Sequence, residues 1–143
     1  MSKPFTIYFA SSNKDKLKEI KSILKNLKVK TQNSKFKTQS LKLKIAPENF
    51  SVNENGKTFI ENAYKKASAL SKKVKSIAFA DDSGIEIFAL NGKPGVKSSR
   101  FFRNGKGMLE ILERVKNNKN KKCCFTCALV GSDPKGKIIF KTQ

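Results

Sequence analysis

Hydrophobic and polar positions repeat with two different periods along this chain. Apolar residues at alternate positions predict strands over residues 5–10, 41–45 and 138–140. Apolar residues three and four positions apart predict helices across residues 17–27, 59–74 and 108–116. Residues 123–130 are apolar on both faces, which predicts a central strand. Strands and helices therefore interleave, and the hairpin near the C-terminus makes the sheet mixed, so we predict an α/β fold with a mixed central β-sheet flanked by helices.

The stretch from Ile77 to Leu90 breaks the hydrophobic pattern in its middle. Residues 77–80 predict a short buried strand and residues 85–90 predict the next strand, with Asp81, Asp82, Ser83 and a glycine between them. Adjacent carboxylates at the end of a buried segment lose water and raise each other's pKa, so a bound cation would stabilise them. Magnesium prefers such hard oxygen ligands. The alternative is that these residues simply form and cap a turn.

A second polar segment separates the first strand from the first helix. Ser11 begins it, and Ser12 or Asn13 supplies the predicted N-cap of the helix. A helix N-terminus directly after a strand is able to bind an anion, and Lys14 and Lys16 add positive charge there. The alternative is an ordinary strand-to-helix turn on a lysine-rich protein.

The second helix has a clear start signal in Thr58 and Glu61, which form a capping box. Lys66 lies near the apolar stripe of this helix and is within reach of the cleft that contains the aspartate pair. A lysine in such a position more often lies on the surface, so both interpretations stay open. Glu54 lies in the polar loop before the helix, and the residue pattern alone does not single it out.

Composition narrows the classes of function. The 143 residues suit one domain, 1–143, and carry a formal net charge of +20. Arginine occurs at only three positions, so a lysine-rich surface with non-specific attraction to nucleic acid is favoured over a base-reading module. The absence of histidine excludes histidine-based catalysis. No targeting segment or membrane-spanning run is visible, and the chain is expected to be cytoplasmic.

The cysteines lie close together at Cys123, Cys124 and Cys127. This odd, clustered set does not suit a secreted disulfide framework, and a structural zinc site would need a second ligand pair. We therefore predict small buried thiols on a strand.

Four motifs occur in a fixed order along the chain. They are Ala-Ser-Ser-Asn-Lys-Asp-Lys at 10–16, Glu-Asn-Gly-Lys-Thr-Phe-Ile-Glu-Asn-Ala at 54–63, Ala-Asp-Asp-Ser-Gly-Ile at 80–85, and Leu-Asn-Gly-Lys-Pro-Gly-Val-Lys-Ser-Ser-Arg-Phe at 90–101. In order and spacing they resemble the inosine/xanthosine triphosphate pyrophosphatase family, which removes aberrant nucleotides. Each motif alone is a weak signal, whereas the ordered set is highly specific.

The resemblance implies an ITPase-like fold and hydrolysis of dITP, ITP or XTP to the monophosphate and pyrophosphate by a Mg²⁺-dependent homodimer. It implies that Asp82 is the general base and a metal ligand, with Glu54 and Asp81 as the other metal-site residues and Lys66 as a catalytic cation. The residues that it assigns to substrate binding are Ser11, Ser12, Asn13, Lys14, Asp15, Lys16, Ser83 and Arg100.

One departure from the family concerns the C-terminal part. The family continues with Phe-Gly-Tyr-Asp and Ser-His-Arg stretches that form much of the base pocket, and these are absent here. We therefore expect a fragment or a shortened relative, with an exposed sheet edge and poor solubility or dependence on a partner. Three alternatives remain: an inactive fragment, a basic nucleic-acid-binding module, or a related pyrophosphatase with another base preference.

Overall fold

The computed structural model describes residues 5–11, 14–26, 41–103 and 105–143. Its central feature is one mixed sheet with the strand order β2-β1-β3-β5-β6, and the short β4 pairs with β3. The strands are β1 (Phe5–Phe9), β2 (Leu41–Ile45), β3 (Ala78–Ile87), β4 (Lys93–Pro94), β5 (Cys123–Ser132) and β6 (Ile138–Thr142). The helices are α1 (Lys14–Asn26), α2 (Phe59–Val74), α3 (Ser98–Phe102) and α4 (Gly107–Val115), with 3₁₀ turns at Phe88–Leu90 and Gly95–Lys97.

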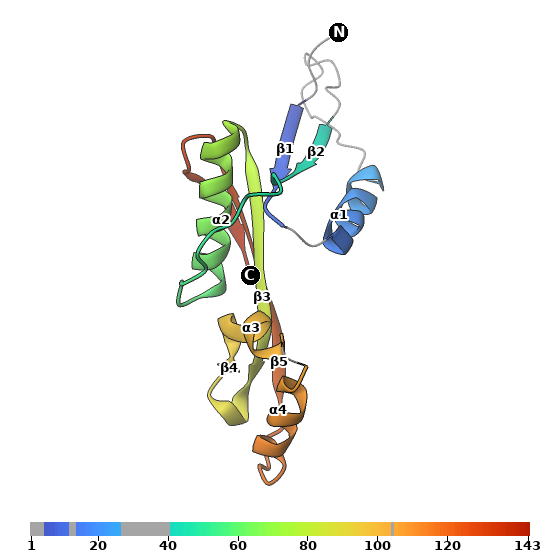
Figure 1. Cartoon of the computed structure of the whole chain (residues 1–143), viewed down its shortest axis with the longest axis vertical. Coiled ribbons are helices and arrows are strands. Elements are labelled where there is room, and N and C mark those ends of the chain that lie inside the picture. Colours follow the sequence, from blue (N-terminus) through green and yellow to red (C-terminus); the bar gives the residue numbers. More distant parts are fainter. Residues whose placement is uncertain (1–4, 12–13, 27–40, 104) are drawn as a thin grey trace.

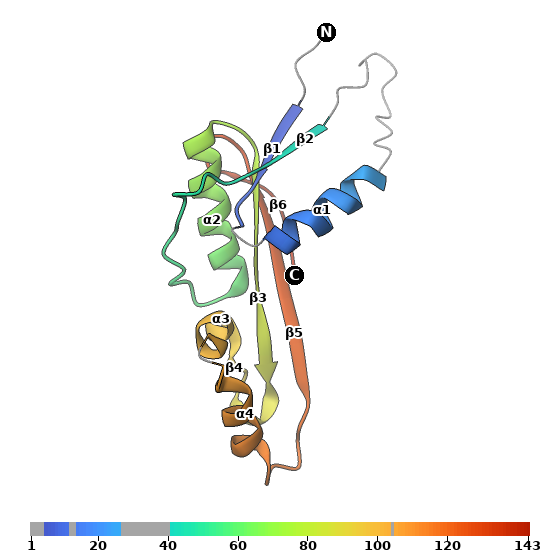
Figure 2. The same ribbon diagram turned by 45° about the vertical axis from the view of Figure 1, so that its right-hand side comes forward.

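The strand directions confirm the predicted mixed α/β fold. β1 pairs in parallel with β2 and β3, whereas β3 with β5 and β5 with β6 are antiparallel. The views in Figures 1 and 2 show α1 and α2 on opposite sides of the sheet, with α3 and α4 beside the far end of the β3–β5 ribbon. The predicted central strand, β5, does lie inside the sheet between β3 and β6.

Helix α2 packs closely against the middle of the sheet, as its alanine-rich stripe predicts. Its core face contributes Phe59, Ala63, Ala67 and Leu70, which cluster with alanine and valine side chains of β3 and β5. The Thr58 hydroxyl accepts a hydrogen bond from the Glu61 amide at 3.1 Å, so the predicted N-cap is present. This packing fixes the helix over the two strands that carry the polar residues.

The aspartate-containing stretch differs from its prediction. Asp81, Asp82 and Ser83 do not form a turn between two short strands, because β3 continues through them for 10 residues. Their backbone pairs with Leu129, Ala128 and Cys127 of β5, so inter-strand pairing decides the conformation here. Because side chains alternate along a strand, Asp81 and Asp82 point to opposite faces of the sheet.

Two further predictions are corrected and one is confirmed. The Pro94-Gly95 pair predicts a loop that continues through residues 98–100, but these residues belong to α3. The three cysteines lie on β5 as predicted, but they are exposed and not buried. The Asn91-Gly92 pair is a strong turn signal in the sequence, and these residues do form a turn, with φ values of 52° and 79°. In the part of the chain that the structure describes, no helix combines the length and apolar character needed to cross a membrane.

Candidate active site

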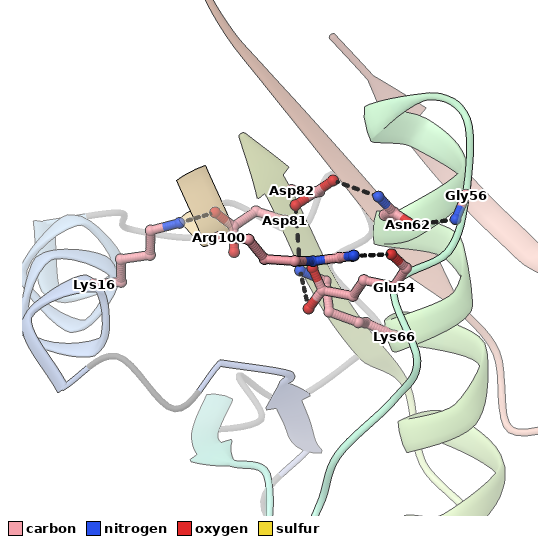
Figure 3. A network of polar contacts seen from close by, with 8 residues as sticks. All are labelled: Lys16, Glu54, Gly56, Asn62, Lys66, Asp81, Asp82 and Arg100. Carbon is pink, nitrogen blue, oxygen red and sulfur yellow. Dashed lines mark hydrogen bonds and ion pairs between the residues drawn. The ribbon is translucent and has the colours of Figure 1, made fainter. Parts of the chain in front are cut away.

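Asp82 lies at the centre of a polar cluster between β3 and α2 (Figure 3). Asn62 and Lys66 are one helical turn apart on α2, so both project toward Asp82. The Asn62 side-chain amide donates to Asp82 Oδ2 at 3.0 Å, and Lys66 Nζ lies 3.7 Å from Asp82 Oδ1. Helix α2 therefore contacts both oxygens of one carboxylate that is only 9% exposed.

The loop before α2 brings a second carboxylate to the same cluster. Glu54 Oε1 lies 3.4 Å from Lys66 Nζ, so the ammonium group is shared between Glu54 and Asp82. The Arg100 guanidinium donates to the carbonyl oxygen of Glu54. The Gly56 amide of the same loop donates to Asn62 Oδ1 at 2.7 Å. The loop is thus held from α2 on one side and from α3 on the other.

Asp81 faces the opposite side of the sheet from Asp82. Its carboxylate forms an ion pair with Lys16 of α1, as Figure 3 shows. The two neighbouring carboxylates therefore have different lysine partners, which reduces the repulsion that their adjacency in the sequence implies.

Burial changes the acid–base behaviour of Asp82. The pKa of its carboxyl is raised above the ordinary value, first because burial disfavours the ionised form. The hydrogen bond from Asn62 and the charge of Lys66 oppose this rise in pKa, whereas the charges of Glu54 and Asp81 add to it. A carboxylate with a raised pKa accepts a proton from water more readily than an ordinary aspartate.

A cleft of about 610 Å³ opens beside the cluster. Its lining includes seven of the residues that sequence analysis assigned to the site, drawn from the segment after β1, from α1, β3 and α2, and from the loop before α2. They are Ser11, Lys16, Glu54, Lys66, Asp81, Asp82 and Ser83. The remaining lining consists of Ala10, Ser99 and residues 45–48 and 50–52, which include an apolar wall with Phe50 and Val52.

The other assigned residues lie outside this lining. Arg100 contacts the site through the Glu54 carbonyl. Lys14 and Asp15 form the start of α1, and Ser12 and Asn13 fall outside the described residues. Sequence analysis missed Ser99 and Asn62. For Asn62 a signal existed: an asparagine that shares the core-facing stripe of a helix is a buried polar group that needs partners.

The oxygen-rich donor set suits a hard divalent cation. Asp82 and Glu54 already share one cationic group, the Lys66 ammonium, and Mg²⁺ commonly uses one or two carboxylates together with substrate phosphates. Within residues 5–11, 14–26, 41–103 and 105–143, no cluster of three or more His, Cys, Asp or Glu side chains forms a complete protein cage for a metal. The residues present therefore fit a cation that also needs ligands from a bound phosphate.

The fold and the cleft together define an α/β protein with paired carboxylates and lysines, a combination suited to a cation-bound phosphate ligand. The chain belongs to the Ham1 family, whose model matches residues 7–143. This assignment confirms the resemblance seen in the sequence, because relatives in the family are named dITP/XTP pyrophosphatase.

Curated relatives match most of this chain. The dITP/XTP pyrophosphatase of Prochlorococcus marinus subsp. pastoris is 38% identical over 138 residues, covering 96% of this chain and 66% of the relative. The dITP/XTP pyrophosphatase of Borreliella burgdorferi is 36% identical over 145 residues, covering 94% of this chain and 65% of the relative. The chain therefore spans about two thirds of the length of these relatives.

Solved structures show the same fold. The Staphylococcus aureus Ham1 protein is 30% identical with a TM-score of 0.76, covering 95% of this chain and 68% of that one. A HAM1 protein from Coxiella burnetii is 28% identical with a TM-score of 0.77, covering 94% and 68%. These matches confirm the predicted mixed sheet flanked by helices.

Proposed function

We propose that this chain carries the phosphate- and metal-binding site of a nucleoside triphosphate pyrophosphatase that acts on dITP, ITP or XTP and removes them from the cytoplasmic nucleotide pool. The observation that carries the proposal is the Glu54–Lys66–Asp82 cluster on the wall of the cleft. The names of the relatives support the substrate class.

In the proposed reaction, water adds across the anhydride between the α- and β-phosphates, giving the nucleoside monophosphate and pyrophosphate. Asp82 accepts the proton of the attacking water, and its position on the cleft wall beside Lys66 suits this role. A Mg²⁺ ion held by Asp82 and Glu54, with support from Asp81, would neutralise phosphate charge and orient the phosphates. Lys66 supplies a fixed positive charge next to both carboxylates.

We assign the triphosphate to the part of the cleft next to α1. Ser11, Lys16 and Ser83 line it, and the positive end of the α1 helix dipole, together with the Lys16 charge, favours an anion there. By motif position, Ser12, Asn13, Lys14 and Asp15 belong to the same phosphate site, and Arg100 supports it through the Glu54 loop.

The test is hydrolysis of dITP, XTP and dGTP by the purified chain with and without Mg²⁺, with pyrophosphate and orthophosphate measured separately. We expect Mg²⁺-dependent pyrophosphate release that is faster with dITP and XTP than with dGTP. Orthophosphate release would contradict the proposal. Salt-sensitive binding of DNA or RNA without any hydrolysis would favour the basic binding module instead.

We also propose that the chain assembles as a homodimer. Exposed apolar side chains on α4 and β5 support this, because Met108, Leu109, Leu112 and Phe125 are 54%, 70%, 55% and 72% exposed. Sedimentation equilibrium should give twice the 16.0 kDa chain mass. A monodisperse monomer that melts cooperatively at high concentration would contradict this part of the proposal.

A further inference from the structure

Asn62 is a polar side chain with no exposed surface, on the face of α2 that packs against the sheet. Burying a side-chain amide costs free energy unless its polar atoms are hydrogen-bonded. Asn62 meets this requirement with two hydrogen bonds. One goes to the Asp82 carboxylate on β3, and the other comes from the backbone of the loop that carries Glu54. Among the described residues, no buried side-chain nitrogen or oxygen lacks a partner.

Both neighbours require the same orientation of the Asn62 amide. The Gly56 N–H only donates, so the atom 2.7 Å from it must be the side-chain oxygen. The amide nitrogen then faces Asp82 Oδ2, 3.0 Å away, which is able to accept its proton. An ionised aspartate at this position would lack the donor to Asp82, and leucine would keep neither bond.

The approach of the loop to Asn62 also depends on glycine. A Cβ atom at Gly56 would lie 2.6 Å from Asn62 Oδ1 and 2.9 Å from Glu61 Cβ, so any other residue would push the loop away from α2. Figure 3 shows the resulting chain of contacts, which runs from Gly56 through Asn62 to Asp82, while Lys66 joins Asp82 to Glu54.

We propose that Asn62 is a positioning residue that holds Asp82 and the Glu54 loop at a fixed separation, so that the two carboxylates face one cation together. Lys66 joins the same two groups by charge, whereas Asn62 joins them by directional bonds in a buried position. The inference deepens the proposed function and rests on it for the assignment of Asp82 and Glu54 to the cation. Asn62 itself acts through these residues and does not contact substrate.

The test compares Asn62→Leu, which keeps the branched shape of the side chain and removes both bonds, with Asn55→Leu as the matched control. Asn55 lies in the same loop, is exposed, and accepts a hydrogen bond from Lys65 Nζ at 2.6 Å. Mn²⁺ binding to the nucleotide-free chain, followed by electron paramagnetic resonance, should weaken by about 10- to 100-fold in Asn62→Leu, the usual effect of removing a group that orients a ligand. Asn55→Leu should bind Mn²⁺ as the wild type does.

A second variant keeps the test sharp if Asn62→Leu does not fold. Gly56→Ala keeps the Asn62 side chain, but its Cβ would push the loop away from Asn62 and disturb the hydrogen bond between Gly56 N–H and Asn62 Oδ1. It should therefore also weaken Mn²⁺ binding. The effects of the two variants should not add when they are combined, because both act on one contact. Equal Mn²⁺ affinity in the wild type and in either folded variant would overturn the inference.

A metal-independent measurement separates this inference from the proposed function. Hydrogen exchange of the Gly56 amide should be slow in the wild type and in Asn55→Leu, and about tenfold faster in Asn62→Leu, as expected for loss of one hydrogen bond. If the wild type binds no Mn²⁺ but the exchange result holds, the proposed metal site fails and the positioning of the loop by Asn62 stands. Equally fast exchange in all three proteins would overturn the positioning role.

Discussion

Replacing Asp82 with asparagine removes the charge of the proposed base and keeps its volume. Asp82 is 9% exposed, so the change acts on a buried group with fixed neighbours. Loss of a general base slows a reaction by about 10²- to 10⁴-fold. Because each factor of ten corresponds to 1.36 kcal/mol, the barrier should rise by roughly 3 to 5 kcal/mol.

Although Asp82→Asn should slow the reaction, it should not lower the free energy of unfolding. At the 3.7 Å distance between Lys66 Nζ and Asp82 Oδ1, the attraction is about 4.5 kcal/mol at an effective dielectric constant of 20. The raised pKa of Asp82 means that burial and the neighbouring carboxylates outweigh this attraction. Lys66 also keeps Glu54 at 3.4 Å, so the variant leaves no unpaired lysine. The variant should therefore be at least as stable as the wild type at neutral pH.

The pH dependence follows from the direction of the pKa shift. A carboxyl group whose pKa is raised by folding stabilises the fold fully below its unfolded pKa of about 3.8 and loses this contribution as the pH rises through the folded pKa. In EDTA, the melting temperature of Asp82→Asn minus that of the wild type should therefore increase as the pH rises from about 4 to neutral. With Mg²⁺ at 100 times its Kd, only the wild type should gain about 2.7 kcal/mol of stability.

Two results would refute this reasoning. One is an Asp82→Asn protein that hydrolyses dITP at a rate near that of the wild type. The other is an Asp82→Asn protein that melts well below the wild type at neutral pH in EDTA, because this would mean that the buried charge stabilises the fold.

Three further changes test other parts of the account. Lys66→Met should lower kcat by about 10²-fold or more through loss of a fixed cation, whereas Lys65→Met on the adjacent position should not, and equal rates would contradict the assignment. Thr58→Ala removes the 3.1 Å cap bond of α2 and should cost about 1 kcal/mol in urea unfolding, so an unchanged midpoint would count against the cap. Gly84→Ala places a Cβ 2.5 Å from Ser98 Oγ and should cost about 1 to 3 kcal/mol in the same assay, where a neutral effect would show that the backbone is able to move apart.

Local patterns predicted most of the fold because they determine most of its elements. Alternation identified β1, β2 and β6, and the spacing of apolar residues identified α1, α2 and α4. The continuity of β3 could not be predicted locally, since Asp and Ser favour turns and only pairing with β5 keeps them extended. The burial of the cysteines was mispredicted for a similar reason: the apolar character of a strand does not show whether a layer covers it.

The ordered sequence motifs predicted most of the residues that line the candidate site. Ser11, Lys16, Glu54, Lys66 and Asp82 do line one cleft, although they come from distant parts of the chain. Their roles remain predictions. What the motifs did not convey is the division of Asp81 and Asp82 between two faces of the sheet, because this depends on β3 being continuous.

The measurement that tests the central claim most directly is product analysis of dITP hydrolysis at saturating Mg²⁺, with the wild type and Asp82→Asn side by side. The account predicts that the wild type releases dIMP and pyrophosphate in equal amounts, without orthophosphate, and that Asp82→Asn releases both at least about 10²-fold more slowly. Equal turnover by the two proteins, or orthophosphate as the first product of the wild type, would contradict it.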